Sequence, residues 1–134
     1  MKPPLRRDDL VYPELSYSII GCAYEVWDEL GPGHLEKMYQ KAMAIAFRNR
    51  KITFQEQVHY SLKFKSEIIG KGFLDFLVED KIIVELKKDG HFSKTHIEQV
   101  LEYLKLSHIK LAILINFTTE GVKSKRIVNV NLDS

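Results

Sequence analysis

Three charged residues interrupt two short apolar segments near the middle of the sequence. Asp75 lies within residues 72–78, and Glu85 and Lys87 lie within residues 81–87. Both segments are otherwise rich in β-branched and aromatic residues, which is typical of buried strands. Because burying an unpaired charge costs free energy, these three side chains need a local chemical reason to be there.

A three-residue loop at residues 79–81 would join the two segments as a hairpin and place Asp75 opposite Glu85. Side chains two apart on a strand share a face, so Glu85 and Lys87 point the same way, and on this register Asp75 joins them. The other face is then expected to carry apolar side chains only: Leu74, Phe76, Val78, Ile82, Val84 and Leu86.

Two adjacent carboxylates are suited to a hard divalent cation. Mg²⁺ binds through one or two carboxylates and substrate phosphate oxygens while it keeps several waters, and Mn²⁺ is the alternative ion. A strand offers its backbone carbonyl between two inward side chains, so the Leu86 carbonyl is positioned to complete the coordination. The same three charges could instead form a cross-strand ion pair on a solvated face, and their spacing alone does not separate the two interpretations.

Length and composition predict a single domain over residues 13–134, preceded by a flexible arm over residues 1–12. Twenty basic and 18 acidic residues give a net charge of +2, so any nucleic-acid footprint must be local. No apolar run is long enough to cross a bilayer, so we expect a cytoplasmic protein without a membrane partner. The single Cys22 is expected to be a small buried residue on a helix.

Helical periodicity predicts three helices, over residues 13–30, 34–50 and 93–106. In the second helix the expected core stripe is Leu35, Met38, Ala42, Ile45 and Ala46, with Glu36, Tyr39 or Gln40, and Met43 on an adjoining stripe. In the third helix the expected core stripe is Ile97, Val100, Leu101 and Leu104, with His96, Gln99 and Tyr103 along the neighbouring edge.

Five strands are predicted, over residues 53–65, 67–78, 81–87, 110–117 and 127–132. Residues 110–117 form a continuous apolar run, which indicates a strand buried on both faces. The fold class is therefore α/β with a mixed (α+β) sheet and helices on both faces. The third helix is expected to cross over between two parallel strands.

This element order, read with Asp75, residues 85–87 and residues 99–103, resembles the PD-(D/E)XK nuclease superfamily. The resemblance implies a restriction-endonuclease-like αβββαβ core, here with an extra N-terminal helix and a C-terminal strand. Residues 33–39, with Gly33, Glu36 and Tyr39, resemble the GxxExxY family, and residues 115–117 and 125–127 match its later motifs. Two positions depart from the pattern: Trp27 stands where this family often has His, and Leu74 where the superfamily nominally has Pro.

The resemblance implies that Asp75, Glu85 and Glu36 bind a metal and that Lys87 is the catalytic lysine. Gln99 and Tyr103 match the Gln-xxx-Tyr motif of the RecB and lambda-exonuclease-like branch and are expected at the catalytic site. Without the resemblance, Glu36 would be interpreted as an acid favoured in the first turn of a helix, and Gln99 and Tyr103 as residues that cap the edge of the core. His96 is expected to be a solvated or structural histidine.

The implied function is metal-dependent hydrolysis of nucleic-acid phosphodiester bonds, with DNA expected over RNA and a homodimer as a further hypothesis. Lys123, Lys125 and Arg126 could follow a phosphate backbone, and Phe92 is the best single candidate for stacking on a base. The alternative function is a non-catalytic module that binds nucleic acid or protein and keeps the nuclease fold. A third hypothesis is an ion-pair cluster in a scaffold protein.

Overall fold

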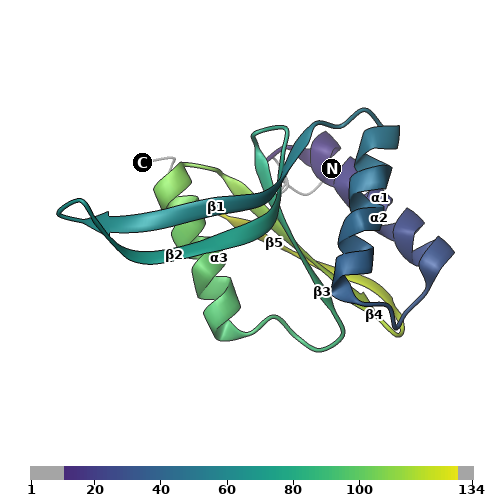
Figure 1. The fold of residues 1–134 in the computed structure, drawn as a ribbon. Helices are drawn as coiled ribbons and strands as arrows, with labels where there is room; N and C mark the ends of the chain where they lie inside the picture. Colours follow the sequence, from purple (N-terminus) through teal and green to yellow (C-terminus); the bar gives the residue numbers. More distant parts are fainter. Residues whose placement is uncertain (1–10, 130–134) are drawn as a thin grey trace, which may run out of the picture.

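The computed structural model describes residues 11–129. It contains three helices and five strands in the order α1 (Pro13–Leu30), α2 (Glu36–Asn49), β1 (Phe54–Phe64), β2 (Glu67–Val78), β3 (Ile82–Lys88), α3 (Lys94–Ser107), β4 (Leu111–Thr118) and β5 (Gly121–Val128). Figure 1 shows that the β1–β2 hairpin extends away from the body of the molecule.

The strands form one sheet in the order β1-β2-β3-β4-β5. β3 and β4 are parallel, and every other neighbouring pair is antiparallel. Helix α3 supplies the crossover between the two parallel strands, since an antiparallel hairpin turn could not join them. The predicted mixed α/β fold with a restriction-endonuclease-like core is confirmed.

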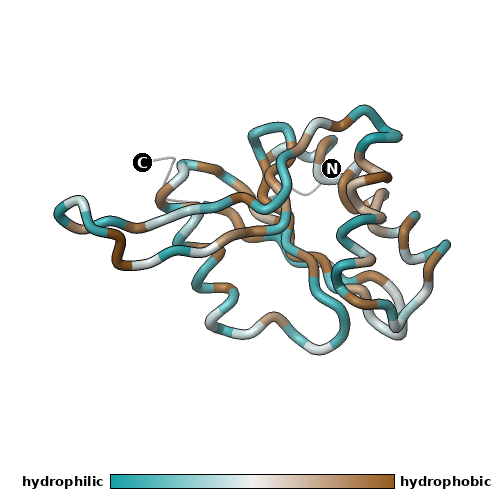
Figure 2. Tube along the Cα trace, viewed as in Figure 1, coloured by the Kyte–Doolittle hydropathy of each residue, from teal (hydrophilic) through white to brown (hydrophobic). Residues whose placement is uncertain are grey.

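Two apolar cores flank the sheet. Side chains of α1 and α2 pack on one face, in a first core that includes Ile19, Tyr39, Phe47 and Phe76. Side chains of α3 pack on the other face, in a second core that includes Leu104. Figure 2 shows hydrophobic segments where the strands cross the middle of the molecule. Cys22 is fully buried on α1, as predicted.

The predicted buried face of α2 is wrong by a rotation about the helix axis, whereas that of α3 is wrong at one position. Leu35, Met38 and Ile45 are 64%, 44% and 51% exposed, whereas Tyr39 and Phe47 are fully buried. The stripe through Tyr39, Met43 and Phe47 buries larger side chains, and Tyr39 keeps its hydroxyl bonded to the Gly31 carbonyl. On α3, Val100 and Leu104 are buried as predicted, but Leu101 is exposed and Tyr103 also lies in the second core.

The last strand begins earlier than predicted, at Gly121 rather than at residue 127. A turn bonded by the Thr118 hydroxyl, which accepts from Glu120 N and donates to the Gly121 carbonyl, returns the chain directly alongside β4. Lys123 and Lys125 make this segment resemble a loop in the sequence, but lysines are common on an edge strand. Residues 130–132 of the predicted strand lie outside the described residues.

The hairpin of β2 and β3 has the predicted three-residue loop, because Val78 pairs with Ile82 and Phe76 with Val84. One predicted orientation is wrong: Leu74 packs with the second core, whereas Phe76 packs with the first. The cause lies opposite Asp75 on β1, where Gln57 has a left-handed φ of 53°. On one side of this point Phe54 and Phe76 pack with the first core, and on the other side Val58 and Leu74 pack with the second core.

Val11 and Tyr12, at the end of the predicted N-terminal arm, are partly buried against the first core. Residues 1–10 lie outside the described residues. Over residues 11–129, none of the helices combines the length and the apolar character needed to cross a membrane.

Candidate functional site

Asp75 and Glu85 meet where β2 and β3 diverge. The backbone ladder between these strands runs from Val78 and Ile82 to Phe76 and Val84. At the next position, the side chains of Asp75 and Glu85 take the place of the backbone-to-backbone hydrogen bonds. Asp75 N donates to Glu85 Oε1 at 2.5 Å, and Leu86 N donates to Asp75 Oδ2 at 2.8 Å. We call Asp75 and Glu85 the carboxylate pair. Figure 1 shows β2 and β3 separating beyond it.

The carboxylate pair is largely removed from water, and Glu85 is only 5% exposed. Burial raises the pKa of Glu85 to about 8, and the negative charge of Asp75 adds to this effect. Burial likewise raises the pKa of Asp75 to about 6, although its hydrogen bond from Leu86 acts in the opposite direction. Low-dielectric surroundings and mutual repulsion both penalise the doubly ionised pair, so the site favours a bound cation or proton.

His96 on α3 is the side chain that completes this cluster. Its Nε2 lies 2.5 Å from Glu85 Oε2. Desolvation and the nearby charge of Lys87 lower the pKa of His96, while the pKa of Glu85 is raised. In the metal-free protein these opposite shifts favour a neutral hydrogen-bonded pair, with the carboxyl proton donated to the ring nitrogen, over an ion pair.

Glu36 stands in the first turn of α2, exposed at the edge of the site. Its charge contributes to the raised pKa values of Asp75 and Glu85. Tyr39 fixes the segment leading into this turn, because its hydroxyl donates to the Gly31 carbonyl at 2.7 Å and accepts from His34 N at 3.3 Å. Its ring also stacks on Phe117 at 4.3 Å.

Lys87 follows the carboxylate pair along β3 and is partly exposed. Its charge acts on His96, so the ammonium lies near the cluster. Among residues 11–129 it has neither a hydrogen bond nor an ion pair within bonding distance, which leaves its ammonium available to a ligand. Leu86, whose carbonyl was the fourth predicted metal ligand, donates its backbone N–H to Asp75.

Gln99 and Tyr103 lie farther along the edge of α3 and contact the β1–β2 hairpin. A Cβ added to Gly72 would lie 2.6 Å from Gln99 Nε2 and 2.8 Å from the Tyr60 hydroxyl, so this glycine admits both side chains. The rings of Tyr60 and Tyr103 meet edge to face at 5.6 Å. Both predicted residues therefore brace the hairpin that carries Asp75.

The donor set fits a divalent cation in its chemistry. Two largely buried carboxylates from adjacent strands lie side by side next to a neutral histidine, and hard cations prefer carboxylate and carbonyl oxygens. In the part of the chain that the structure describes, no three His, Cys, Asp or Glu side chains are close enough to enclose an ion by themselves. Water and substrate oxygens would therefore supply the remaining ligands, as Mg²⁺ commonly requires.

A sequence profile of the PD-(D/E)XK nuclease superfamily matches residues 13–128. The chain belongs to the PD-(D/E)XK nuclease superfamily. The crystal structure of SSO0001 is similar in fold, with a TM-score of 0.54 and 17% identity over 91% of this chain. This superfamily member spans only 62% of the SSO0001 chain.

A second similar structure is that of a phage-related exonuclease from Haemophilus somnus 129PT. It has a TM-score of 0.45 and 10% identity, over 98% of this chain and 82% of that one. No curated protein matches the sequence significantly.

His96 is the residue whose place in the site sequence reasoning missed. Its position on the same helical edge as Gln99 and Tyr103 was visible, but nothing in the spacing indicated which of the three would reach the carboxylate pair. The signal available in the sequence was proximity along the chain: His96 is in the first turn of α3, and this turn follows β3 after a short loop.

Proposed function

We propose that this PD-(D/E)XK superfamily member hydrolyses nucleic-acid phosphodiester bonds with a divalent metal ion. The observation that carries the proposal is the carboxylate pair, which is buried, mutually repulsive and raised in pKa. For binding alone, two acids held together would repel an anionic polymer.

Asp75 and Glu85 would hold the ion, with Glu36 and the Leu86 carbonyl at its periphery. Mg²⁺ is the proposed ion and Mn²⁺ the alternative. When bound, such an ion lowers the pKa of a coordinated water and polarises a phosphoryl oxygen. His96 keeps Glu85 in its orientation through the Nε2 contact, and the backbone N–H groups of Asp75 and Leu86 hold the carboxylates in register.

Lys87 is proposed as the catalytic lysine. Its ammonium, which has no hydrogen-bond or ion-pair partner among residues 11–129, can orient the attacking water or stabilise charge that develops on the phosphoryl oxygens. Gln99 and Tyr103, proposed to support catalysis, would act by fixing the hairpin that presents Asp75.

Several finer assignments belong to the same proposal. Gly33, Glu36 and Tyr39 support membership of the GxxExxY family, and Gln99 with Tyr103 supports the RecB and lambda-exonuclease-like branch. We propose DNA rather than RNA as the substrate and the cytoplasm as the location. A homodimer would allow two protomers to address two strands.

A cleavage assay tests the proposal with a matched pair of lysines on β3. We expect Lys87→Ala to lower cleavage by at least about 100-fold, because it removes a charge aimed at the transition state. Lys88, its immediate neighbour, points to the opposite face, and Lys88→Ala should retain activity within about threefold. The substrates are single- and double-stranded DNA and RNA, each with Mg²⁺ or Mn²⁺.

Equal residual cleavage by the wild type and Lys87→Ala in every condition would contradict catalysis at this site. Binding of nucleic acid by the wild type without any metal-dependent cleavage would instead support the non-catalytic module. Asp75→Asn serves as a second inactive variant, since it keeps a side-chain oxygen for the Leu86 N–H.

A further inference from the structure

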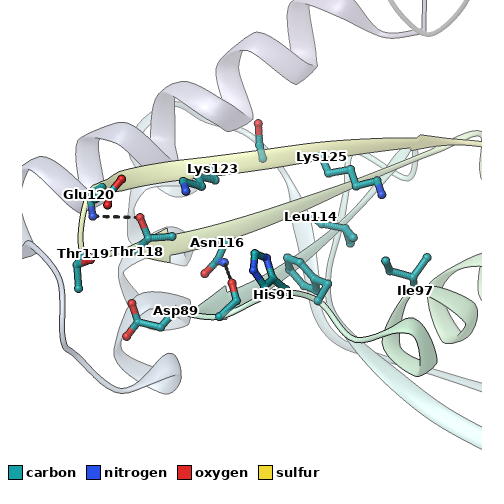
Figure 3. Close-up of a pocket in the computed structure, with 13 residues that line it drawn as sticks. Asp89, His91, Ile97, Leu114, Asn116, Thr118, Thr119, Glu120, Lys123 and Lys125 are labelled. Atoms are coloured by element: carbon teal, nitrogen blue, oxygen red, sulfur yellow. Dashed lines mark hydrogen bonds between the residues drawn. The ribbon is translucent and has the colours of Figure 1, made fainter.

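A cavity of about 420 Å³ opens beside the carboxylate pair, at the carboxyl ends of the two parallel strands (Figure 3). Its wall includes the segment after β3, from Asp89 to Phe92, and the end of β4 with Asn116. In open α/β sheets, ligands bind preferentially outside the carboxyl ends of strands. The volume is within the range of small-molecule sites and accommodates one nucleotide unit.

Asn116, in the wall of the cavity, carries an unused hydrogen-bond acceptor. The side chain is 7% exposed, and its Nδ2 donates to the Gly90 carbonyl at 2.6 Å. Because a carbonyl can only accept, this bond fixes which end of the amide faces Gly90. Oδ1 is then buried, and no hydrogen-bond donor reaches it from within residues 11–129. A buried acceptor without a partner costs free energy that a ligand donor would recover.

The register of the sheet aligns this cavity with the proposed catalytic groups. Lys87 pairs with Asn116 across β3 and β4, and Asn116 pairs with Lys123 across β4 and β5. In the adjacent row, Glu85 pairs with Leu114, and Leu114 pairs with Lys125. Cross-strand partners lie on the same face of a sheet, so the acids, the catalytic lysine and the cavity share one face.

Phe92 connects the cavity wall to the carboxylate pair. It is partly buried beside the second core, and its ring lies 5.1 Å from the ring of His96, which contacts Glu85. On the opposite side of the wall, a Cβ at Gly90 would lie 3.7 Å from Lys87 Cε. The cavity is therefore the next space along the sheet from the site of cleavage.

The charges around the cavity are divided between its ends. Figure 3 shows Asp89 and Glu120 at the end near Thr118 and Lys125 at the end near Ile97, with Lys123 between Glu120 and Lys125. The Lys125 end belongs to the same cross-strand row as Glu85. A phosphate is favoured at this basic end, and the acidic end disfavours continuation of the backbone there.

We propose that this cavity receives one unpaired nucleotide of the substrate strand, next to the phosphate that is cut. Its base stacks on Phe92 and donates a hydrogen bond to Asn116 Oδ1, and its phosphate lies against Lys123 and Lys125. This inference rests on the proposed function, since it specifies the substrate of the same site as a strand with an accessible base. A base held in a duplex would not reach Asn116.

The test compares three fluorescein-labelled probes by anisotropy in EDTA, so that none is cut: a single-stranded DNA 12-mer, the same backbone without bases, and a blunt 12-base-pair hairpin. We expect the wild type to bind the intact strand at least about fivefold more tightly than the base-free strand, as stacking on one aromatic ring predicts. Phe92→Ala should weaken binding of the intact strand by about 10-fold and leave the base-free strand unchanged.

Lys123→Ala and Lys125→Ala should each weaken binding of both the intact and the base-free DNA strand. Each should also lower the slope of log affinity against log salt concentration by about 0.7. Lys105→Ala, at the far end of α3, is the control and should bind like the wild type. Asn116→Ala should reduce the preference for the intact strand. Asn116→Ala also removes the hydrogen bond to the Gly90 carbonyl, so the melting temperature of this variant is measured as well. If Asn116→Ala fails to fold, the test depends on Phe92→Ala.

Equal affinity of the wild type for intact and base-free strands, or an equal effect of Phe92→Ala on both, would overturn the nucleotide subsite. Metal-dependent cleavage that persists in that case would leave the proposed function standing. Absence of both binding and cleavage for every probe would overturn the subsite and the proposed function together.

Discussion

Glu85→Gln should stabilise the metal-free protein at alkaline pH while abolishing cleavage. Gln has the same shape as Glu, and its carbonyl can still accept from Asp75 N while its amide donates to His96 Nε2. The substitution therefore retains the hydrogen bonds of the site and removes only the charge. A residue that serves metal binding at the expense of folding is expected to behave in this way.

The magnitude follows from the pKa of Glu85, which burial and Asp75 raise from 4.5 to about 8. The folded state thus holds a proton that the unfolded state has released over this interval, so stability falls as the pH rises from about 4.5 to 8. Each pH unit across the interval corresponds to at most about 1.4 kcal/mol. Allowing for water entry and relaxation, we expect a net cost of about 2 kcal/mol at pH 8.

The assay is thermal and urea unfolding in EDTA between pH 7 and 8. This range lies above the ordinary pKa of His96, whose lowered pKa makes stability rise with pH at lower values. At pH 8 the melting temperature of Glu85→Gln should exceed that of the wild type by about 5–10 °C, as about 2 kcal/mol implies for a domain of this size. Glu98→Gln, at an exposed position on α3, should change it little.

Mg²⁺ should stabilise the wild type more than Glu85→Gln, because a bound ligand stabilises only the state that holds its site. A wild type whose stability is flat or rises between pH 7 and 8, or a Glu85→Gln variant that melts lower at pH 8, would refute the reasoning. Either result would mean that the carboxylate pair is ionised without strain in the absence of a cation.

Two further substitutions test how the site is supported. Gly72→Ala should destabilise the protein by about 1–3 kcal/mol in urea unfolding, because the new Cβ would meet the stiff Tyr60 ring at 2.9 Å; Gly70→Ala, two residues away with open space around it, should be neutral. An equal effect at both glycines would contradict the close approach. Tyr39→Phe should cost about 1–2 kcal/mol and raise the metal concentration needed for cleavage, since it releases the segment before Glu36. Tyr24→Phe, at a half-exposed position, is its control, and equal metal requirements for the two variants would argue against this role.

The hairpin at the centre of the site was predictable because its evidence is local. The length of the loop at residues 79–81 fixes the register, and the register fixes which side chains meet, so Asp75 and Glu85 were paired correctly from sequence. The Asp89-Gly90 break and the crossover by α3 follow from turn chemistry and from the need to join parallel strands.

The helix faces were less predictable, because several stripes of α2 are apolar enough to be buried. Which stripe is buried depends on residues outside the helix. Tyr39 is buried because the Gly31 carbonyl accepts a hydrogen bond from its hydroxyl and Phe117 stacks on its ring. The orientation of Leu74 depends in the same way on the backbone of Gln57, which no local pattern around residue 74 reveals. The contact of His96 with Glu85 also arises only once α3 is docked.

The carboxylate pair also has a consequence for interpreting related sequences. Asp75 and Glu85 each accept a backbone hydrogen bond that joins β2 to β3, so losing either acid would weaken the sheet as well as the chemistry. A descendant that had lost its activity could keep both acids for folding alone. Lys87 has no comparable bond among the described residues, so nothing in the sheet would preserve it in a relative that lacked the proposed catalysis. The lysine, rather than the acids, is therefore the residue whose replacement would mark an inactive relative.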